Sequence, residues 1–364
     1  MKLEASPRRH LAGLTEAKLA LWARGRGASE GAARALARTA VARFAGREPS
    51  AASGTASAAL LRSLHDDLDD TLPAAEAITD PDGTVRFAVR LEDSAVVETV
   101  LIHQAAESGR ARERLTICVS SQVGCARGCV FCETGRLGLQ RNLRADEIVC
   151  QVALASRHAA AHGLPAPKNV VFMGMGEPLD NLDEVVAAID VLRERRGFAI
   201  PERRITVSTV GIVPRIDELF ARTAANLAVS LHAIEPAARR SLLPLVARRF
   251  PLEDLRAAIA RAPRPVLLQW TLIQGENDRD LDADLLVEFC SGLDVRVNLI
   301  PLNPGPKPEQ RAPSIEQCRA FQKRLLDRGV RALLRLPHGQ SVGGACGQLA
   351  GARRPAVVRE HREK

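Results

Sequence analysis

Three cysteines in one short segment are the residues best suited to carry chemistry. Cys125, Cys129 and Cys132 form a CxxxCxxC pattern. Three thiolates at this spacing can ligate three irons of a cubane cluster and leave the fourth iron open for a substrate that chelates it. A structural zinc site is the main alternative, but it needs a fourth ligand, for which His158 and His162 are the patterned candidates. The pattern therefore predicts a metal centre, either iron–sulfur or zinc.

Two further cysteines and one acid receive no clear role from their own local patterns. Cys346 lies in the glycine-rich run Gly343 to Gly347, a loop that can present a thiol but cannot bury it in a regular element. Taken alone, it is a free loop cysteine, Cys118 is a core residue at the end of a strand, and Glu98 is a solvent-facing acid of a strand. The remaining cysteines have no motif spacing, and we expect them to be small buried hydrophobic residues: Cys150, Cys290 and Cys318.

The elements that must position these residues alternate between strand and helix. Apolar runs of strand length recur from Leu115 onward: Leu115–Ser120, Asn169–Met173, Arg204–Thr209, Asn226–His232, Val266–Ile273, Val295–Ile300 and Ala332–Leu336. Helical windows separate them, among them Ala145–Ala161, Leu182–Glu194, Pro214–Thr223, Asp282–Gly292 and Ser314–Arg328. Repeated βα units predict an α/β fold with a parallel sheet, closed into a full or partial barrel whose site lies at the carboxyl ends of its strands.

The segment before the barrel has a different character. Leu11 to Phe44 is rich in Ala, Leu and Arg and predicts two or three helices, with breaks around Gly25, Gly27 and Gly31. The β-rich runs Val85–Leu91 and Ala95–Ile102 flank turn residues and predict a hairpin between this helical part and the barrel.

Composition and charge narrow the class of protein. With 46% hydrophobic and 26% charged residues, the chain is neither disordered nor collagen-like. Its net charge of +8 is concentrated at the two ends, because residues 1–48 carry +6 and residues 352–364 carry +3. These ends are either a phosphate-binding surface or the solvated faces of Arg-rich helices. The chain has no apolar run of membrane length and no apolar signal peptide at its start, so we expect a cytoplasmic protein without a membrane partner.

The cysteine motif, with Phe131 before its last cysteine, resembles that of the radical S-adenosylmethionine (SAM) superfamily. Longer segments resemble the RlmN/Cfr family in particular: Cys118–Cys125, Arg141–Leu143, Met173–Pro178, Ser230–His232, Asn298–Pro301 and Ala345–Leu349. The resemblance extends in order from about Val85 to Gly351, whereas the helical N-terminus matches only loosely. Members of this family methylate an adenosine of RNA at an unactivated ring carbon.

The resemblance implies the cofactors and the residues that bind them. We expect one 4Fe–4S cluster per chain on Cys125, Cys129 and Cys132, with SAM bound to the open iron and split to a 5′-deoxyadenosyl radical. The family residues that contact SAM match positions that all lie at or just after predicted strand ends: Gly176, Glu177, Ser208, Ser230, Leu231, His232 and Asn303. An electron donor such as flavodoxin or ferredoxin is implied as well, and we expect a monomer.

The resemblance also assigns the three residues that are ambiguous alone. Cys346 becomes the methyl carrier: one SAM methylates its sulfur, and a second yields the radical that removes hydrogen from that methyl group before it adds to the adenine ring. Cys118 then attacks Cys346 to form a transient disulfide, and Glu98 takes the proton from the ring carbon.

These expectations divide the chain into four parts. Residues 1–75 form a basic helical domain that contacts RNA, 76–110 a β-hairpin linker carrying Glu98, 111–345 the core barrel of partial (β/α)6 type, and 346–364 the catalytic-cysteine loop and basic tail. The expected activity is methylation of adenosine carbon 2 in 23S ribosomal RNA, with transfer RNA as a second substrate.

Departures from the family pattern leave other functions open. His338, Gln340 and Ser341 stand in the segment Leu336–Gly344 where charged residues are usual, and Glu133 after the last cluster cysteine is also unusual. The alternatives are methylation at carbon 8 as in the Cfr type, and a cluster-containing RNA-binding protein without methylation activity. A radical SAM enzyme acting on a small molecule or a protein is disfavoured by the basic N-terminus and the longer motifs.

Overall fold

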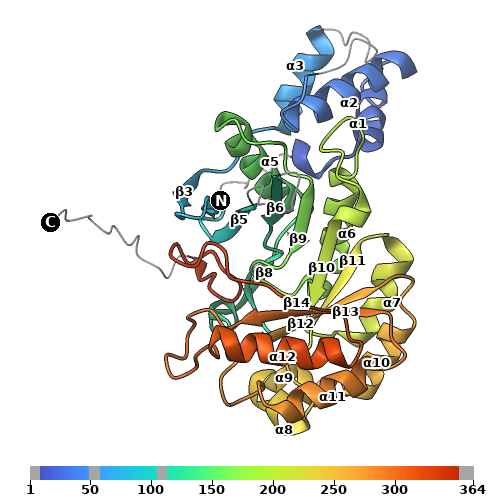
Figure 1. Cartoon of the computed structure of the whole chain (residues 1–364). Helices are drawn as coiled ribbons and strands as arrows, with labels where there is room; N and C mark the ends of the chain where they lie inside the picture. The colour runs from blue at the N-terminus through green and yellow to red at the C-terminus, as the bar shows by residue number, and fades with distance from the viewer. Residues whose placement is uncertain (1–8, 49–57, 105–112, 352–364) are drawn as a thin grey trace, which may run out of the picture.

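A ten-stranded sheet forms the centre of the computed structural model, which describes residues 9–48, 58–104 and 113–351 (Figure 1). From one edge to the other its strands are β14 (Ala332–Leu334), β13 (Val295–Pro301), β12 (Val266–Leu272), β11 (Asn226–Ser230), β10 (Ile205–Thr209), β9 (Asn169–Phe172), β6 (Arg114–Cys118), β5 (Val96–Gln104), β4 (Val85–Arg90) and β3 (Ala75–Thr79). All pairings from β14 to β6 are parallel, and those from β6 to β3 are antiparallel.

Helices follow the parallel strands and cover the outer face of the sheet (Figure 1). They are α5 (Ala145–Ala161), α6 (Leu182–Leu192), α7 (Val213–Arg222), α10 (Leu252–Ala260), α11 (Asp280–Cys290) and α12 (Ile315–Asp327). Strands covered by helices on one face and facing the barrel interior on the other bury nearly all their residues, as β12 and β13 do, which explains why their sequences are largely apolar. The partial barrel of (β/α)6 type expected from the sequence is confirmed.

The expected hairpin is present as β4 and β5, and it extends the barrel sheet. Glu98 of β5 lies opposite Ala88 of β4, and Val100 lies opposite Cys118 of β6. The strand that carries Glu98 is therefore hydrogen-bonded to the strand that carries Cys118. β3 adds a third antiparallel strand, which the sequence analysis did not predict.

A second, small hairpin brackets the cysteine motif. Its strands β7 (Gln122–Cys125) and β8 (Gly138–Asn142) pair antiparallel with an irregularity at Gly124, and the short helix α4 (Glu133–Arg136) lies between them. Gly124 has φ 78°, and a Cβ there would lie 1.8 Å from the carbonyl oxygen of Gly138. Only glycine permits this close approach, which holds the two ends of the motif together.

The N-terminal part is helical, as expected. It contains α1 (Glu16–Arg24), α2 (Glu30–Phe44) and α3 (Ala58–Asp67), which lie together at one end of the molecule (Figure 1). The side chains of Thr15 and Ser29 cap α1 and α2 by accepting hydrogen bonds from backbone N–H groups. Gly31 lies inside α2, so it does not break the helix as predicted, because the cap at Ser29 sets where that helix begins. No helix in the described part of the chain is long and apolar enough to cross a membrane.

Candidate active site

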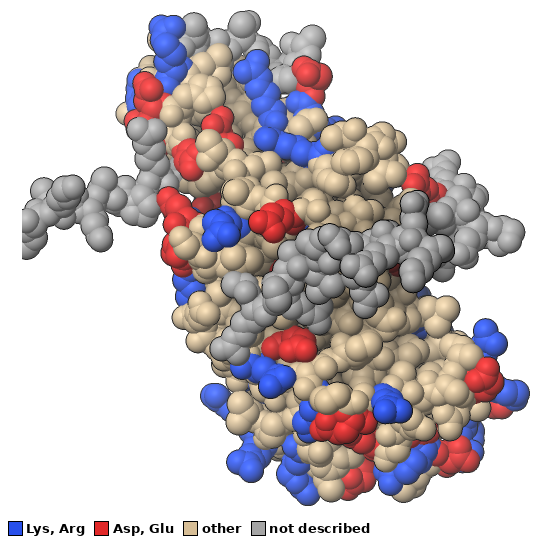
Figure 2. Space-filling view, turned by 90° about the vertical axis from the view of Figure 1, so that its left-hand side faces the viewer, with Lys and Arg blue, Asp and Glu red and all other residues tan. Residues whose placement is uncertain are grey.

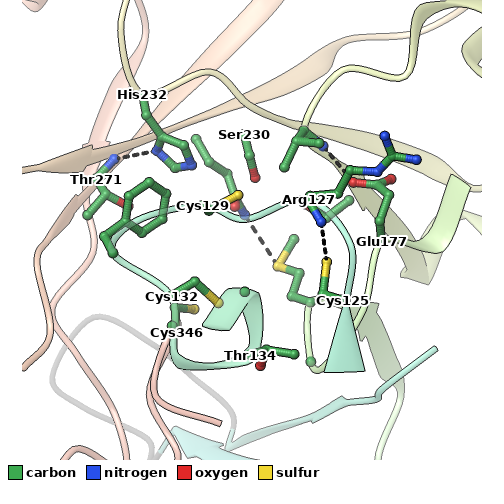
Figure 3. A pocket seen from close by; sticks show the side chains of 18 of the residues that line it. Cys125, Arg127, Cys129, Cys132, Thr134, Glu177, Ser230, His232, Thr271 and Cys346 are labelled. Atoms are coloured by element: carbon green, nitrogen blue, oxygen red, sulfur yellow. Dashed lines mark hydrogen bonds between the residues drawn. The ribbon is translucent and has the colours of Figure 1, made fainter. Parts of the chain in front are cut away.

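Ten of the residues singled out by the sequence line one cavity at the carboxyl ends of the parallel strands (Figure 3). They come from the cysteine motif, from the carboxyl ends of β10 and β11, from the segments that follow β9, β11 and β13, and from the C-terminal loop: Cys125, Cys129, Cys132, Gly176, Glu177, Ser208, Ser230, His232, Asn303 and Cys346. Among the expected SAM-binding residues, Leu231 does not line the cavity: its side chain is fully buried, and its backbone N–H donates to the Gln269 carbonyl.

The three motif cysteines are free thiols that share this cavity. Burial raises the pKa of Cys125 to about 12 and raises the pKa of Cys129 well above its usual value; the neighbouring motif thiols add to both shifts. Three such thiols disfavour being charged together unless a cation binds them, and metal binding removes their protons. The donor set of three soft sulfur atoms facing one cavity fits an iron–sulfur cluster with one iron left open.

The histidine pair proposed as a zinc ligand lies elsewhere. His158 and His162 stack on each other at the end of α5 with ring centroids 4.0 Å apart, and His158 packs edge-on against Phe87 at 5.1 Å. Neither lines the cavity. Across residues 9–48, 58–104 and 113–351, no three His, Cys, Asp or Glu side chains gather as ligands of one metal ion.

Gly176 and Glu177 shape the wall after β9. Gly176 has φ 104°, and a Cβ there would lie 2.6 Å from the Cβ of Gln122, so this close contact requires glycine. The Glu177 carboxylate accepts hydrogen bonds from Leu179 N at 3.1 Å and Val210 N at 2.9 Å. Burial nevertheless raises its pKa to about 7. Glu177 can therefore hold a proton near neutral pH and become an anion when a cationic group binds beside it.

His232 after β11 is held as a neutral hydrogen-bond donor. Its Nδ1 accepts from Thr271 N at 3.0 Å, so the proton lies on Nε2. Burial lowers its pKa to about 3, and the positive charge of Arg239 adds to this shift. His232 has φ 57°, a conformation that is uncommon outside glycine, and Asn277 fixes it by donating from Nδ2 to the His232 carbonyl at 2.7 Å. The ring also packs edge-on against Phe131 with centroids 4.8 Å apart.

Cys346 lies on an exposed loop that is fastened to the rest of the site. Asn303 Nδ2 donates to the Cys346 carbonyl at 3.0 Å, and Glu133 N donates to the Gly347 carbonyl at 2.8 Å. These bonds hold the loop against the end of β13 and against the cysteine motif. In Figure 3, Cys346 lies beside Cys132, and a Cys346 thiolate would raise the Cys132 pKa, although burial is the main cause of that shift.

Cys346 also borders a second cavity, which it shares with Cys118. Met173 and Arg335 line this second cavity too. Burial raises the pKa of Cys118 to about 12; negative charge on Cys346 adds to the shift and positive charge on Arg335 opposes it. The loop thiol therefore lies between the motif cysteines on one side and Cys118 on the other.

Glu98 is buried behind the C-terminal loop and lines neither cavity. Its Oε2 accepts from Ala350 N at 2.6 Å and Gly351 N at 3.0 Å, and its Oε1 is paired with Arg86. In this arrangement Glu98 holds the far end of the loop that carries Cys346. Its action as a base remains a prediction.

The atypical segment before Cys346 is fixed by two aspartates of the turn between β3 and β4. Asp82 accepts from Gly339 N at 3.0 Å, and Asp80 accepts from Ser341 N at 3.0 Å and from its hydroxyl at 2.6 Å. His338 Nδ1 lies 3.2 Å from Asp82. The uncharged residues of this segment are thus matched to acids on a neighbouring turn.

Several residues that line the main cavity were missed by the sequence analysis. Gln269 and Thr271 project into it from β12. Their signal was present, because they are the two polar residues of an otherwise apolar strand and share one of its faces. Arg127 follows Cys125, donates from its backbone N–H to the Cys125 sulfur at 3.5 Å and pairs with Asp180. It was overlooked because the motif was analysed for its thiols alone.

Comparison with known proteins agrees with this geometry. Residues 119–286 match the model of the radical SAM superfamily, which defines the class of the chain. The chain is 45% identical over 361 residues to the "Probable RNA methyltransferase sce1580" of Sorangium cellulosum, covering 95% of this chain and 89% of that protein. It is 43% identical over 274 residues to the "Dual-specificity RNA methyltransferase RlmN" of Syntrophotalea carbinolica, covering 74% and 70%.

A solved structure supports the same assignment. The crystal structure of a radical SAM methyltransferase from Sphaerobacter thermophilus matches with a TM-score of 0.84 and 37% identity, over 94% of this chain and 99% of that one. The chain belongs to the RlmN/Cfr family of radical SAM RNA methyltransferases. The family implies an iron–sulfur cluster and SAM as cofactors and RNA as substrate.

Proposed function

We propose that this enzyme methylates carbon 2 of an adenosine in RNA through a methyl group carried on Cys346. The observation that carries the proposal is the place of Cys346 between two cavities, one bordered by the motif cysteines and the other by Cys118. A methyl carrier must meet the methyl donor in one position and the resolving thiol in another. Cys346 suits that task because it is exposed, while hydrogen bonds at its own carbonyl and at Ala350 hold the loop that carries it.

The motif cysteines are proposed to hold one 4Fe–4S cluster. When bound, the cluster and SAM together supply an electron and a carbon-centred radical. Glu177 is proposed to accept hydrogen bonds from the ammonium group of SAM, and His232 to donate a hydrogen bond from Nε2 to an acceptor on the same ligand. Gly176, Ser208, Ser230 and Asn303 line the remaining wall. The backbone of Leu231 is proposed to contact SAM as well. An electron donor such as flavodoxin or ferredoxin is proposed for the cluster, and a monomer for the chain.

Cys118 is proposed to release the methylated product by attacking the Cys346 sulfur: a disulfide bond forms, the bond between that sulfur and the methylene carbon breaks, and its electron pair leaves with the product. Thiolates perform this attack, and the thiol of Cys118 has a raised pKa because it is buried. Arg335 in the same cavity favours the thiolate and is the cation best placed to activate it. Glu98 is proposed as the base that takes the ring proton, which requires that RNA binding draw the Ala350 and Gly351 amides away from its carboxylate.

The RNA is proposed to be 23S ribosomal RNA, with transfer RNA as a second substrate. The name of the relatives called dual-specificity RNA methyltransferases supports two substrates. Carbon 2 is favoured by resemblance to the larger branch of the family. Contact with RNA is proposed for the N-terminal helical domain, where exposed Lys18 and Arg43 lie on α1 and α2. On the face shown in Figure 2, basic and acidic side chains are interspersed, so local cations rather than one uniform patch would bind phosphate.

The experiment compares Cys118→Ala and Cys346→Ala proteins expressed with native RNA. Without Cys118 the methylene-bridged adduct cannot be resolved, so Cys118→Ala should accumulate as protein crosslinked to RNA through Cys346. Cys346→Ala lacks the carrier and should form no adduct. Cys290→Ala, a buried cysteine of α11, is the matched control and should behave as wild type. Denaturing gels with nuclease treatment give the readout, and a Cys118→Ala protein that turns over normally would refute the proposed role of that thiol.

A further inference from the structure

The cysteine motif rests on a pair of short helices that the sequence analysis did not predict. They are α8 (Pro236–Leu242) and α9 (Pro244–Arg249), which follow β11. Val130 N donates to the Leu242 carbonyl at 3.2 Å, and Cys129 and Val130 pack on the apolar cluster that includes Leu242 and Val246. The position of the motif therefore depends on α8 and α9.

Arg239 on α8 is a buried cation whose hydrogen-bond partners are all neutral. Its side chain is only 2% exposed. Nη1 donates to the Leu231 carbonyl at 2.6 Å and Nη2 to the Val210 carbonyl at 3.5 Å, while Nε is buried with no partner. Within the described residues, no carboxylate forms an ion pair with this guanidinium. Burying a charge without a counter-charge is strongly unfavourable, and the residues that the structure describes supply no such counter-charge.

Arg239 fastens part of the wall that the motif cysteines share: Val210, whose carbonyl accepts from its Nη2, lines the cavity together with Cys125, Cys129 and Cys132. Burial lowers the pKa of Arg239 to about 10, and the single charge that opposes this shift is a thiolate at Cys129. Cys129 and Ala238, the residue before Arg239, pack on the same apolar cluster. A protonated thiol carries no charge, whereas a cluster held by thiolates is anionic. The proposed cluster would therefore bring negative charge to the cavity whose wall Arg239 fastens.

We propose that Arg239 is the charge partner of the cluster and favours its reduced state. This inference rests on the proposed cluster at Cys125, Cys129 and Cys132. In the reduction step a donor of the flavodoxin or ferredoxin class loses one electron and the cluster gains it, with no bond made or broken. The step adds one negative charge to the site, and a fixed buried cation stabilises the more negative state. Because Arg239 also fastens the Leu231 and Val210 carbonyls, it couples this charge to the wall of the SAM cavity.

The test uses three variants of the anaerobically reconstituted holoenzyme. Arg239→Gln removes the charge but keeps a donor for the carbonyls, Arg239→Lys keeps the charge, and Arg240→Gln removes an exposed charge from the next position of α8. The midpoint potential of the cluster is measured by a redox titration followed by electron paramagnetic resonance. Arg239→Gln should disfavour reduction roughly tenfold, a fall of about 59 mV for a one-electron couple. Arg239→Lys should retain most of the wild-type potential, and Arg240→Gln all of it.

The other outcomes distinguish an electrostatic role of Arg239 from a purely structural one. Equal potentials in wild type and both Arg239 variants, or equal shifts in both, overturn the inference, because a purely structural role would not separate Gln from Lys. If Arg239→Gln cannot hold a cluster while Arg239→Lys can, the charge is required; loss from both variants overturns the inference. Iron and sulfide analysis of the wild-type protein comes first. A wild-type protein without a cluster refutes the proposed function, whereas a normal cluster with unchanged variants refutes only the role of Arg239.

Discussion

The buried carboxyl of Glu177 should make the stability of the cluster-free protein depend on pH. Its pKa rises from the ordinary 4.5 in the unfolded chain to about 7 in the folded protein, chiefly because of burial. An acid whose folded pKa is raised contributes full stability below pH 4.5 and loses that contribution as pH rises through 7. Glu177→Gln keeps the shape and carries no charge at any pH, so it should be spared this loss.

The size of the effect follows from the two pKa values. One pH unit between them corresponds to about 1.4 kcal/mol, so the free energy of unfolding of wild type should fall by about 2.5 kcal/mol relative to Glu177→Gln between pH 5 and pH 8. Urea unfolding of both proteins at each pH gives the difference, in which the titration of all other groups cancels. Glu76→Gln makes the same exchange at an exposed position of β3 and serves as the control. The reasoning would be refuted if the difference in free energy of unfolding between wild type and Glu177→Gln stayed constant with pH.

Three further outcomes are expected. Exchanging Cys125, Cys129 or Cys132 for Ala should abolish the charge-transfer absorption of the reconstituted protein, and stoichiometric zinc without sulfide in the wild type would contradict the cluster assignment. Exchanging Lys18 and Arg43 for Gln should reduce the salt dependence of RNA binding by about 0.7 in logarithmic slope for each lost phosphate contact, whereas Lys323→Gln on distant α12 should leave it unchanged. If Glu98 is the base, Glu98→Gln should accumulate crosslinked RNA as Cys118→Ala does. If Glu98 only holds the Ala350 and Gly351 amides, the C-terminal loop of the variant should be held more weakly and be cleaved faster in limited proteolysis.

The regular elements could be predicted from the sequence because periodicity and end signals are local. Helix α5 has the predicted bounds, Ala145–Ala161, and each predicted barrel strand is present within a few residues. The strands in turn brought the motif residues to one cavity. The hairpin of β7 and β8 could not be predicted, since it depends on the close approach of Gly124 to a backbone carbonyl from another segment.

Contacts between distant segments account for the other features that could not be predicted from the sequence. The bonds of Glu98 to the amides of Ala350 and Gly351 join residues far apart in the chain, and no local pattern indicates them. Arg239 is one of many arginines, and only the packing of α8 on the cysteine motif makes it a buried cation. Its neutral partners, the carbonyls of Leu231 and Val210, and its unpartnered Nε depend on contacts between segments that no local pattern indicates.

Nucleoside mass spectrometry of ribosomal and transfer RNA tests the central claim most directly. RNA is compared from cells that lack the protein, express the wild type or express Cys346→Ala. The account predicts 2-methyladenosine with the wild type and none above background with Cys346→Ala. Methylation at carbon 8 instead would contradict the assignment of carbon 2. Equal amounts of 2-methyladenosine with wild type and Cys346→Ala would contradict methyl transfer through this thiol.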